Sequence, residues 1–315
     1  MDSDKSRITE KQIRWRRKLN PVIKKLGRAF LQNKQVIENR YSLRGKEGVD
    51  TGIVLPEGPV IWAINHGFKD DALGTVLIAR HSYILFASLP MFFNTFDGVL
   101  AYLNGIVLMN RKDAHAKRGA ICNAMEVLRL GADFIIYPEG VWNKTPDKLL
   151  LPLWPGVYRI AVESGCPVVP VVHYLRDAHS KAKDNLIHTV IDDPIDMTSF
   201  SEEQGLRHLR DVMATWYYLM MERYGQSTRA EVLEGQKNVD EAWEAYLKNH
   251  IGAVPYYDVE IETMSDYRPK TIARPEDVFA PIAGIQKADA RIAKSVLYAR
   301  GLVEQERRRD FQRRF

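Results

Sequence analysis

Short apolar segments alternate with helical segments between about residues 55 and 225, and this alternation limits the possible fold more than any other feature of the chain. The expected strands are residues 59–64, 83–87, 105–110, 133–137, 167–172 and 186–191. The expected helices between them are about 69–80, 113–130 and 155–164, whereas 91–104 fits either a helix or an apolar loop. Strands separated by helices predict a layered α/β fold, with a mostly parallel central sheet flanked by helices.

The N-terminal segment, residues 1–45, is predicted to be a basic amphipathic helical arm. Residues 1–46 hold 14 Lys and Arg against 4 Asp and Glu. Asn20 and Pro21 predict the start of a helix. Apolar residues then follow at helical spacing on one face, namely Val22, Ile23, Leu26 and Phe30. Such a helix suits an acidic membrane surface, or it packs on the body of the protein with a solvated basic face.

The domain organisation expected from these patterns has three parts. Residues 1–45 are the arm, residues 46–225 the α/β domain, and residues 226–315 a helical C-terminal extension. A helix is expected from Ser201 to Tyr224. The extension carries no chemical motif, so packing, association and surface binding all remain open for it.

Composition and hydropathy predict the cellular compartment of the protein. The start of the sequence lacks the apolar centre of a signal peptide, and the longest apolar runs fall short of the ~20 residues needed to span a bilayer. The two cysteines, Cys122 and Cys166, lie far apart, which favours a reducing compartment. We therefore expect a cytoplasmic protein that is peripherally associated with the membrane. No nucleic-acid-reading motif accompanies the basic arm, so no nucleic acid partner is expected.

The segment INHGFKDD takes an apolar strand directly into Asn65 and His66, with Asp71 five residues after the histidine. Gly67 favours a turn after His66, because glycine is costly inside a helix. With that turn, Asp71 lies in the first turn of the next helix and can reach back to the imidazole. A carboxylate on one ring nitrogen fixes the tautomer and makes the other nitrogen a better proton acceptor.

Other uses of these residues stay open. No G-x-S-x-G motif is present and neither cysteine has a suggestive context. A histidine–aspartate pair without its own nucleophile can still activate a hydroxyl of the substrate. A hydrolase or a metal enzyme is an alternative, but two ligands without an HExxH pattern are weak evidence, and no metal is expected. In the simplest alternative, Asp70 or Asp71 caps the helix and His66 is a turn residue.

Three further segments place distinctive residues at strand exits or within strands. YPEG places Glu139 and Gly140 after a strand, where backbone N–H groups near Gly140 are candidates to stabilise an oxyanion. GIVLMNR delivers Arg111, which can clamp a phosphate or pair with a surface acid. GCPVVPVV contains Pro170, which is typical of an edge or bulged strand.

Taken in order, these segments resemble the four sequence blocks of the glycerolipid or lysophospholipid acyltransferase family, which includes 1-acylglycerol-3-phosphate acyltransferases. The blocks are Asn-His-x-x-x-x-Asp, Gly-x-x-Φ-x-x-Arg, Φ-Pro-Glu-Gly and an apolar strand ending in proline. They correspond here to residues 65–71, 105–111, 137–140 and 168–170. The resemblance covers about residues 40–220.

The resemblance implies an O-acyltransferase of phospholipid biosynthesis. Such an enzyme moves a fatty acyl group from acyl-CoA or acyl-carrier protein, which are co-substrates and not bound cofactors, to a hydroxyl of a lysophospholipid-like acceptor. It implies that His66 is the catalytic general base and Asp71 its catalytic partner. The substrate-binding residues that it implies are Asn65, Arg111, Glu139 and Gly140.

One departure from the family pattern bears on the acceptor. The third block usually continues Thr-Arg-Ser, whereas residues 141–143 here are Val-Trp-Asn. The family's arginine helps to hold the acceptor's phosphate, so a non-phosphatidate acceptor, such as a glycolipid or an aminolipid, is an open alternative. A second alternative is a catalytically inactive lipid- or membrane-binding module of the same fold.

Overall fold

The structure is a computed structural model of the chain. It describes residues 8–38, 53–68, 70–86, 96–109, 114–140, 143, 149–176, 185–225, 235 and 237–238. The predicted C-terminal extension lies almost wholly outside them.

The described chain alternates helices and strands as expected. Its helices are α1 (Glu10–Phe30), α3 (Asp71–Ile78), α5 (Phe96–Asn104), α6 (Ala114–Arg129), α7 (Gly156–Ser164) and α8 (Glu202–Tyr224), with a 3-10 turn, η1 (Met197–Ser199). Its strands are β1 (Gln35–Ile37), β2 (Ile61–Ile64), β3 (Ser82–Phe86), β4 (Ile106–Leu108), β5 (Asp133–Ile136), β6 (Val168–Tyr174) and β7 (Ile187–Ile191).

The strands form one seven-stranded sheet in the order β1-β7-β6-β2-β5-β3-β4. Five consecutive strands of this order, from β6 to β4, pair parallel with one another. Strand β7 is antiparallel to β6, and β1 pairs parallel with β7. The fold class is therefore confirmed as α/β with a mostly parallel central sheet.

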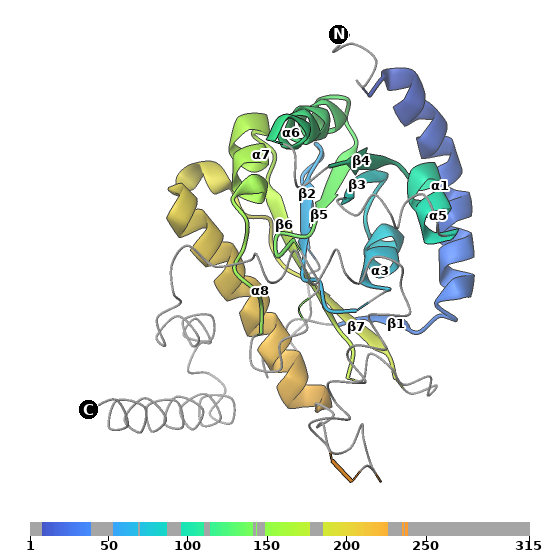
Figure 1. Cartoon of the computed structure of the whole chain (residues 1–315), viewed down its shortest axis with the longest axis vertical. Coiled ribbons are helices and arrows are strands. Elements are labelled where there is room, and N and C mark those ends of the chain that lie inside the picture. Colours follow the sequence, from blue (N-terminus) through green and yellow to red (C-terminus); the bar gives the residue numbers. More distant parts are fainter. Residues whose placement is uncertain are drawn as a thin grey trace.

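Helices cover both faces of the sheet, with α1, α3 and α5 on one side and α6, α7 and α8 on the other (Figure 1). Strand β2 lies at the centre and is buried on both faces, so its alternating side chains enter two cores. Ile61 and Ala63 pack in the core that includes residues of α6, α7 and α8. Trp62 and Ile64 pack in the core that includes residues of α1 and α3.

Each strand expected from the sequence is present. Within the segment 91–104, the described residues 96–104 form the helix α5. Strand β1 was not expected, because it is short and lies at the sheet edge with a polar residue at its start. It comes from the segment assigned to the arm and yet belongs to the sheet. Pro170 lies in a strand paired on both sides, which excludes an edge position.

Strand β6 itself is regular and pairs with β2 through Pro170, but its ladder with β7 is interrupted opposite this residue. The antiparallel ladder between β6 and β7 reaches Val171↔Ile191 and resumes at the isolated bridge Val168↔Ile195. Between these two pairs, β6 has two residues, Val169 and Pro170. The segment after β7 that lies opposite them has three, residues 192–194, and thus one extra residue. Such a bulge accommodates a residue that cannot donate an N–H to the ladder.

The expected helix start at Asn20 and Pro21 is wrong. Helix α1 begins at Glu10, because Thr9 and Gln12 form a reciprocal capping box. Pro21 therefore lies inside the helix, despite the hydrogen bond that it removes. Ile13 and Ile23 are buried, and α1 contacts α3 and α5. The helix is packed on the body of the protein, as the second sequence interpretation allowed.

Among the described residues, no helix combines the length and apolarity required for a membrane crossing.

Candidate active site

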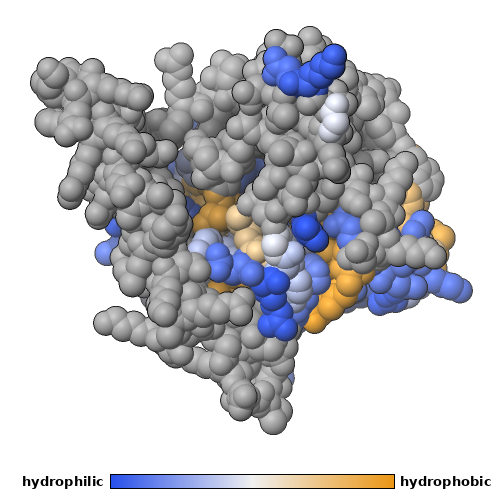
Figure 2. All heavy atoms as spheres, turned by 90° about the horizontal axis from the view of Figure 1, so that it is seen from below, coloured by the Kyte–Doolittle hydropathy of each residue, from blue (hydrophilic) through white to orange (hydrophobic). Residues whose placement is uncertain are grey.

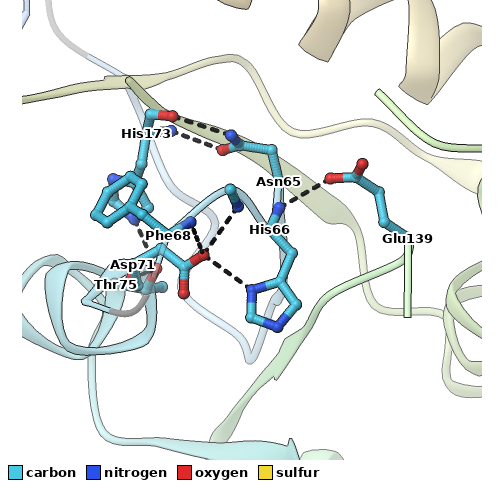
Figure 3. Close-up of polar contacts among 8 residues, drawn as sticks. Asn65, His66, Phe68, Asp71, Thr75, Glu139 and His173 are labelled. Atoms are coloured by element: carbon cyan, nitrogen blue, oxygen red, sulfur yellow. Dashed lines mark hydrogen bonds and ion pairs between the residues drawn. The ribbon is translucent and has the colours of Figure 1, made fainter. Parts of the chain in front are cut away.

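Several polar residues meet at the carboxyl ends of neighbouring strands. His66 follows β2, Glu139 follows β5, and His173 lies near the end of β6. Strand β2 pairs with both β5 and β6, so these positions are adjacent (Figure 3). The carboxyl edge of a parallel sheet is where α/β proteins bind ligands.

His66 and Asp71 lie side by side, with 2.8 Å between the imidazole Nδ1 and the Asp71 Oδ2. The same carboxylate oxygen accepts the backbone N–H groups of Gly67 at 3.1 Å and Phe68 at 3.4 Å. These bonds tie the turn after His66 to the first turn of α3. The side chain of Asp71 is 1% exposed and that of His66 is 19% exposed, so the imidazole is the partner within reach of a substrate. Because a carboxylate only accepts, the contact places the proton on Nδ1 and leaves Nε2 as the ring's acceptor.

Glu139 supports His66 through the backbone. Its Oε1 accepts the N–H of His66 at 2.8 Å, and its Oε2 accepts the N–H of Leu151 at 2.7 Å. The residue is fully buried. Burial raises the pKa of Glu139 to about 8, against the two N–H donors that favour the charged form. Both carboxylate oxygens are thus engaged by backbone N–H groups, and the predicted contact of Glu139 with an acceptor stays a prediction.

Gly140 occupies a tight turn. Its φ is +77°, and a Cβ there would lie 2.8 Å from Nε1 of the Trp154 indole, so a side chain is excluded for two reasons. The N–H of Gly140 donates to the carbonyl of Tyr137 at 3.0 Å. This N–H is therefore engaged in the turn, and the expectation that backbone N–H groups near Gly140 stabilise an oxyanion stays a prediction.

Asn65 is buried and binds the main chain of β6 with both ends of its amide. Its Nδ2 donates to the His173 carbonyl at 2.9 Å, and its Oδ1 accepts the His173 N–H at 2.7 Å. Asn65 thus extends the pairing of β2 with β6 by one position beyond the strand. Its predicted contact with a substrate remains a prediction.

Two residues near the pair were missed in the sequence. The Tyr137 ring lies against His66, with ring centroids 4.2 Å apart and planes tilted by 32°. Burial and the nearby charge of Asp71 raise the pKa of Tyr137 well above its ordinary value. His173 stands inside the apolar run VVPVVHY, and a lone histidine in such a run was the available signal. Arg111, the remaining predicted site residue, lies outside the described residues.

No three His, Cys, Asp or Glu side chains converge into a set of metal ligands within the part of the chain that the structure describes.

The fold and this site define an α/β protein with a histidine–carboxylate pair at the carboxyl edge of its sheet. Residues 36–174 match the protein-family model described as Acyltransferase. This range includes the strand exits that carry His66, Glu139 and His173. This match supports the family resemblance drawn from the sequence blocks over residues 36–174 of the chain.

Several relatives carry the name 1-acyl-sn-glycerol-3-phosphate acyltransferase. The chloroplastic enzyme BAT2 of Brassica napus is 30% identical over 36% of this chain and 32% of its own length. The human beta enzyme is 28% identical over 36% of this chain and 41% of its own length. The matches thus span less than half of either relative.

The chain was also matched to a solved structure. The LPA acyltransferase PlsC from Thermotoga maritima is 22% identical, with a TM-score of 0.49, over 68% of this chain and 83% of its own.

Proposed function

We propose that this protein transfers a fatty acyl group from a thioester, acyl-CoA or acyl-carrier protein, to a hydroxyl of a lysophospholipid-like acceptor. His66 acts as the general base and Asp71 orients it. The proposal is supported by the family match over residues 36–174 and by relatives named as 1-acyl-sn-glycerol-3-phosphate acyltransferases. The observation that carries it is the contact of 2.8 Å between His66 Nδ1 and Asp71 Oδ2 at the carboxyl edge of the sheet.

The proposed reaction needs one base and no nucleophile from the protein. The acceptor hydroxyl gives its proton to Nε2 of His66 while its oxygen forms a bond to the thioester carbonyl carbon. The tetrahedral intermediate then collapses and the carbon–sulfur bond breaks. The proton held by His66 passes to the departing sulfur, giving an ester and a free thiol. A base placed in this way typically contributes ~10² to 10⁴-fold to the rate.

The direct test is acyl transfer by the purified protein and by His66→Ala. Thiol release is followed with acyl-CoA and, separately, with acyl-carrier protein, in the presence of mixed lysolipid acceptors. We expect His66→Ala to lower turnover at least ~10²-fold, because the base is lost. His208→Ala, on the exposed surface of α8, is the matched control and should retain turnover. Transfer by His66→Ala at the wild-type rate, or no transfer by the wild type, would overturn the proposal.

The same reaction identifies the acceptor class by mass spectrometry of the products. Residues 141–143 replace the arginine by which the family holds an acceptor phosphate, so glycolipid and aminolipid acceptors belong in the panel beside lysophosphatidate. A catalytically inactive lipid-binding module would bind acceptors without releasing thiol. The His66–Asp71 pair argues against that alternative, since helix capping alone needs no imidazole.

We further propose that the protein meets its lipid substrates at a membrane surface through α1. Its exposed apolar side chains recur at helical spacing, and four of them are about half exposed: Trp15, Val22, Leu26 and Phe30. Exposed Lys and Arg residues flank this stripe. Hydrophobic and hydrophilic surface lie side by side toward the right in Figure 2, the side on which α1 lies in Figure 1. An apolar stripe with flanking cations suits the headgroup layer of an acidic membrane.

A further inference from the structure

His173 of β6 is a buried histidine with a hydrogen-bond partner on each ring nitrogen. It is 0% exposed. Its Nε2 lies 2.7 Å from the hydroxyl of Thr75 in α3, and its Nδ1 lies 2.8 Å from the hydroxyl of Thr189 in β7. An apolar residue would suit this strand position better on burial alone, since burying an imidazole is costly unless its polar atoms are bonded. The side chain therefore links three elements through polar contacts.

These contacts fit a single run of donors and acceptors. Burial lowers the pKa of His173 to about 4, so the ring is neutral near pH 7 and has one donor and one acceptor. The Thr75 hydroxyl donates to the backbone carbonyl of Asp71 at 3.0 Å, so it accepts from His173 Nε2–H. Nδ1 then accepts from the Thr189 hydroxyl, which itself accepts from the side-chain amide of Gln35 at 3.1 Å.

The same residue touches both segments that carry the His66–Asp71 pair. Its main chain binds both ends of the Asn65 amide, and Asn65 directly precedes His66. Its side chain binds Thr75, one helical turn after Asp71 (Figure 3). The exit of β2 and the first turn of α3 are thus both held against one residue of β6.

The close approach of α3 to β6 depends on Gly74. A Cβ at Gly74 would lie 3.4 Å from Cε1 of His173 and 3.3 Å from Nε2 of Gln35. The Gly74 carbonyl also accepts from that Gln35 amide at 2.9 Å. The small residue leaves room for the Gln35 amide and the histidine ring beside α3, next to Thr75.

We propose that His173 is a positioning residue for the acyl-transfer reaction: its link to Thr75 sets the first turn of α3 so that the Asp71 carboxylate meets His66 Nδ1. The inference rests on the proposed function, because it assigns His173 a task in that reaction. His173 does not contact the reacting atoms, and it acts through Asp71. Misplacement of a catalytic group by about 1 Å can cost ~10²-fold in rate.

Two pairs of variants test the link from both ends. An asparagine amide reaches only the position of Nδ1, whereas a glutamine amide reaches that of Nε2, so His173→Asn loses the bond to Thr75 and His173→Gln retains it. On the other side, Thr75→Val removes the hydroxyl and Thr75→Ser keeps it. We expect His173→Asn and Thr75→Val each to lower kcat about 10- to 100-fold with KM within about twofold.

The conservative variants and the double variant separate positioning from general damage. His173→Gln and Thr75→Ser should recover most of the lost kcat, and His173→Asn with Thr75→Val together should cost no more than either change alone, since both remove one bond. The inference is overturned if His66→Ala abolishes transfer while folded His173→Asn and Thr75→Val keep the wild-type kcat. It is also overturned if the effects fall on KM.

A spectroscopic measurement decides the inference even if no transfer activity is found. The His66 Nδ1 proton held by Asp71 should give a low-field proton NMR resonance, assigned by its absence from His66→Ala. We expect this resonance in the wild type and in His173→Gln, and its loss or broadening in His173→Asn. Its persistence unchanged in folded His173→Asn would contradict the positioning role.

Discussion

At the scale of single residues, the Tyr137 ring supports the His66 imidazole from one side, with 4.2 Å between the ring centroids. An aromatic contact of this kind is worth ~0.5–1.5 kcal/mol beyond the area that it buries. We expect Tyr137→Leu to lower kcat by up to about tenfold, because the imidazole loses its flat neighbour. Tyr137→Phe keeps the ring and should retain most of the rate. Equal rates for the two variants in the thiol-release assay would contradict this role.

Glu139 makes the protein's stability depend on pH. Its pKa is raised from 4.5 to about 8 by burial, so between these values the folded protein holds a proton that the unfolded chain has lost. Folding takes up a proton in this window, and stability therefore falls as pH rises through it. Glu139→Gln does not titrate and lacks this contribution.

We therefore expect the free energy of unfolding of the wild type, relative to Glu139→Gln, to decrease from about pH 5 to pH 9. Urea denaturation of both proteins at several pH values in this range measures the difference. A difference that stays constant, or that grows with pH, would be inconsistent with a buried Glu139 of raised pKa.

At the scale of elements, the packing of α1 on α3 depends on Gly27. A Cβ at this position would lie 2.8 Å from Cδ1 of Leu73 and 3.1 Å from Cδ2 of Leu77, both in α3. We expect Gly27→Val to lower the free energy of unfolding by ~1–3 kcal/mol, a typical cost of overpacking. Valine is a better helix former than glycine, so the loss has to come from crowding.

Ala29→Val, on the exposed surface of the same helix, is the control for that experiment. It adds a β-branched side chain without a neighbouring helix and should cost only a few tenths of a kcal/mol from helix propensity. Urea denaturation of the three proteins compares them. Equal stabilities of Gly27→Val and Ala29→Val would show that α1 does not pack on α3 as closely as described.

At the scale of the whole molecule, the proposed membrane contact depends on a helix that is also part of the fold. Deleting α1 would expose the cores that Ile13 and Ile23 help to close, so the contact is better tested by substitution. We expect Leu26→Glu to weaken sedimentation with anionic vesicles about tenfold or more, since an apolar side chain is worth ~1.5–3 kcal/mol when buried. Added salt should weaken wild-type binding, because the flanking cations are screened.

Val54→Glu is the matched control for the vesicle experiment, because Val54 is 83% exposed and lies outside α1. It makes the same change of charge and polarity at another surface position, and it should leave vesicle binding close to that of the wild type. If Leu26→Glu and Val54→Glu partition alike at low and at high salt, α1 is not the membrane contact.

Much of the fold and part of the site could be predicted along the chain. The strands β2 to β7 are mostly apolar because most of the sheet is buried on both faces, and such segments are visible locally. The His66–Asp71 pair was predictable because its members are five residues apart and joined by a turn. Strand β1 and the start of α1 were not. Strand β1 depends for its pairing on β7, about 150 residues further along the chain. The start of α1 depends on the capping box of Thr9 and Gln12, whereas Asn20 and Pro21 gave the more obvious signal.

The sequence by itself determined the class of the fold, the resemblance to a family, and the local pair that the proposed chemistry needs, because periodicity, turn residues and spacing act within a few residues of one another. Only the tertiary structure decided what surrounds that pair. Glu139 turned out to hold the backbone of His66, and His173 to join β6 to both Asn65 and Thr75. These contacts link residues roughly 70 to 110 positions apart, and hydrogen bonds of such range exist only once the strands have been placed side by side.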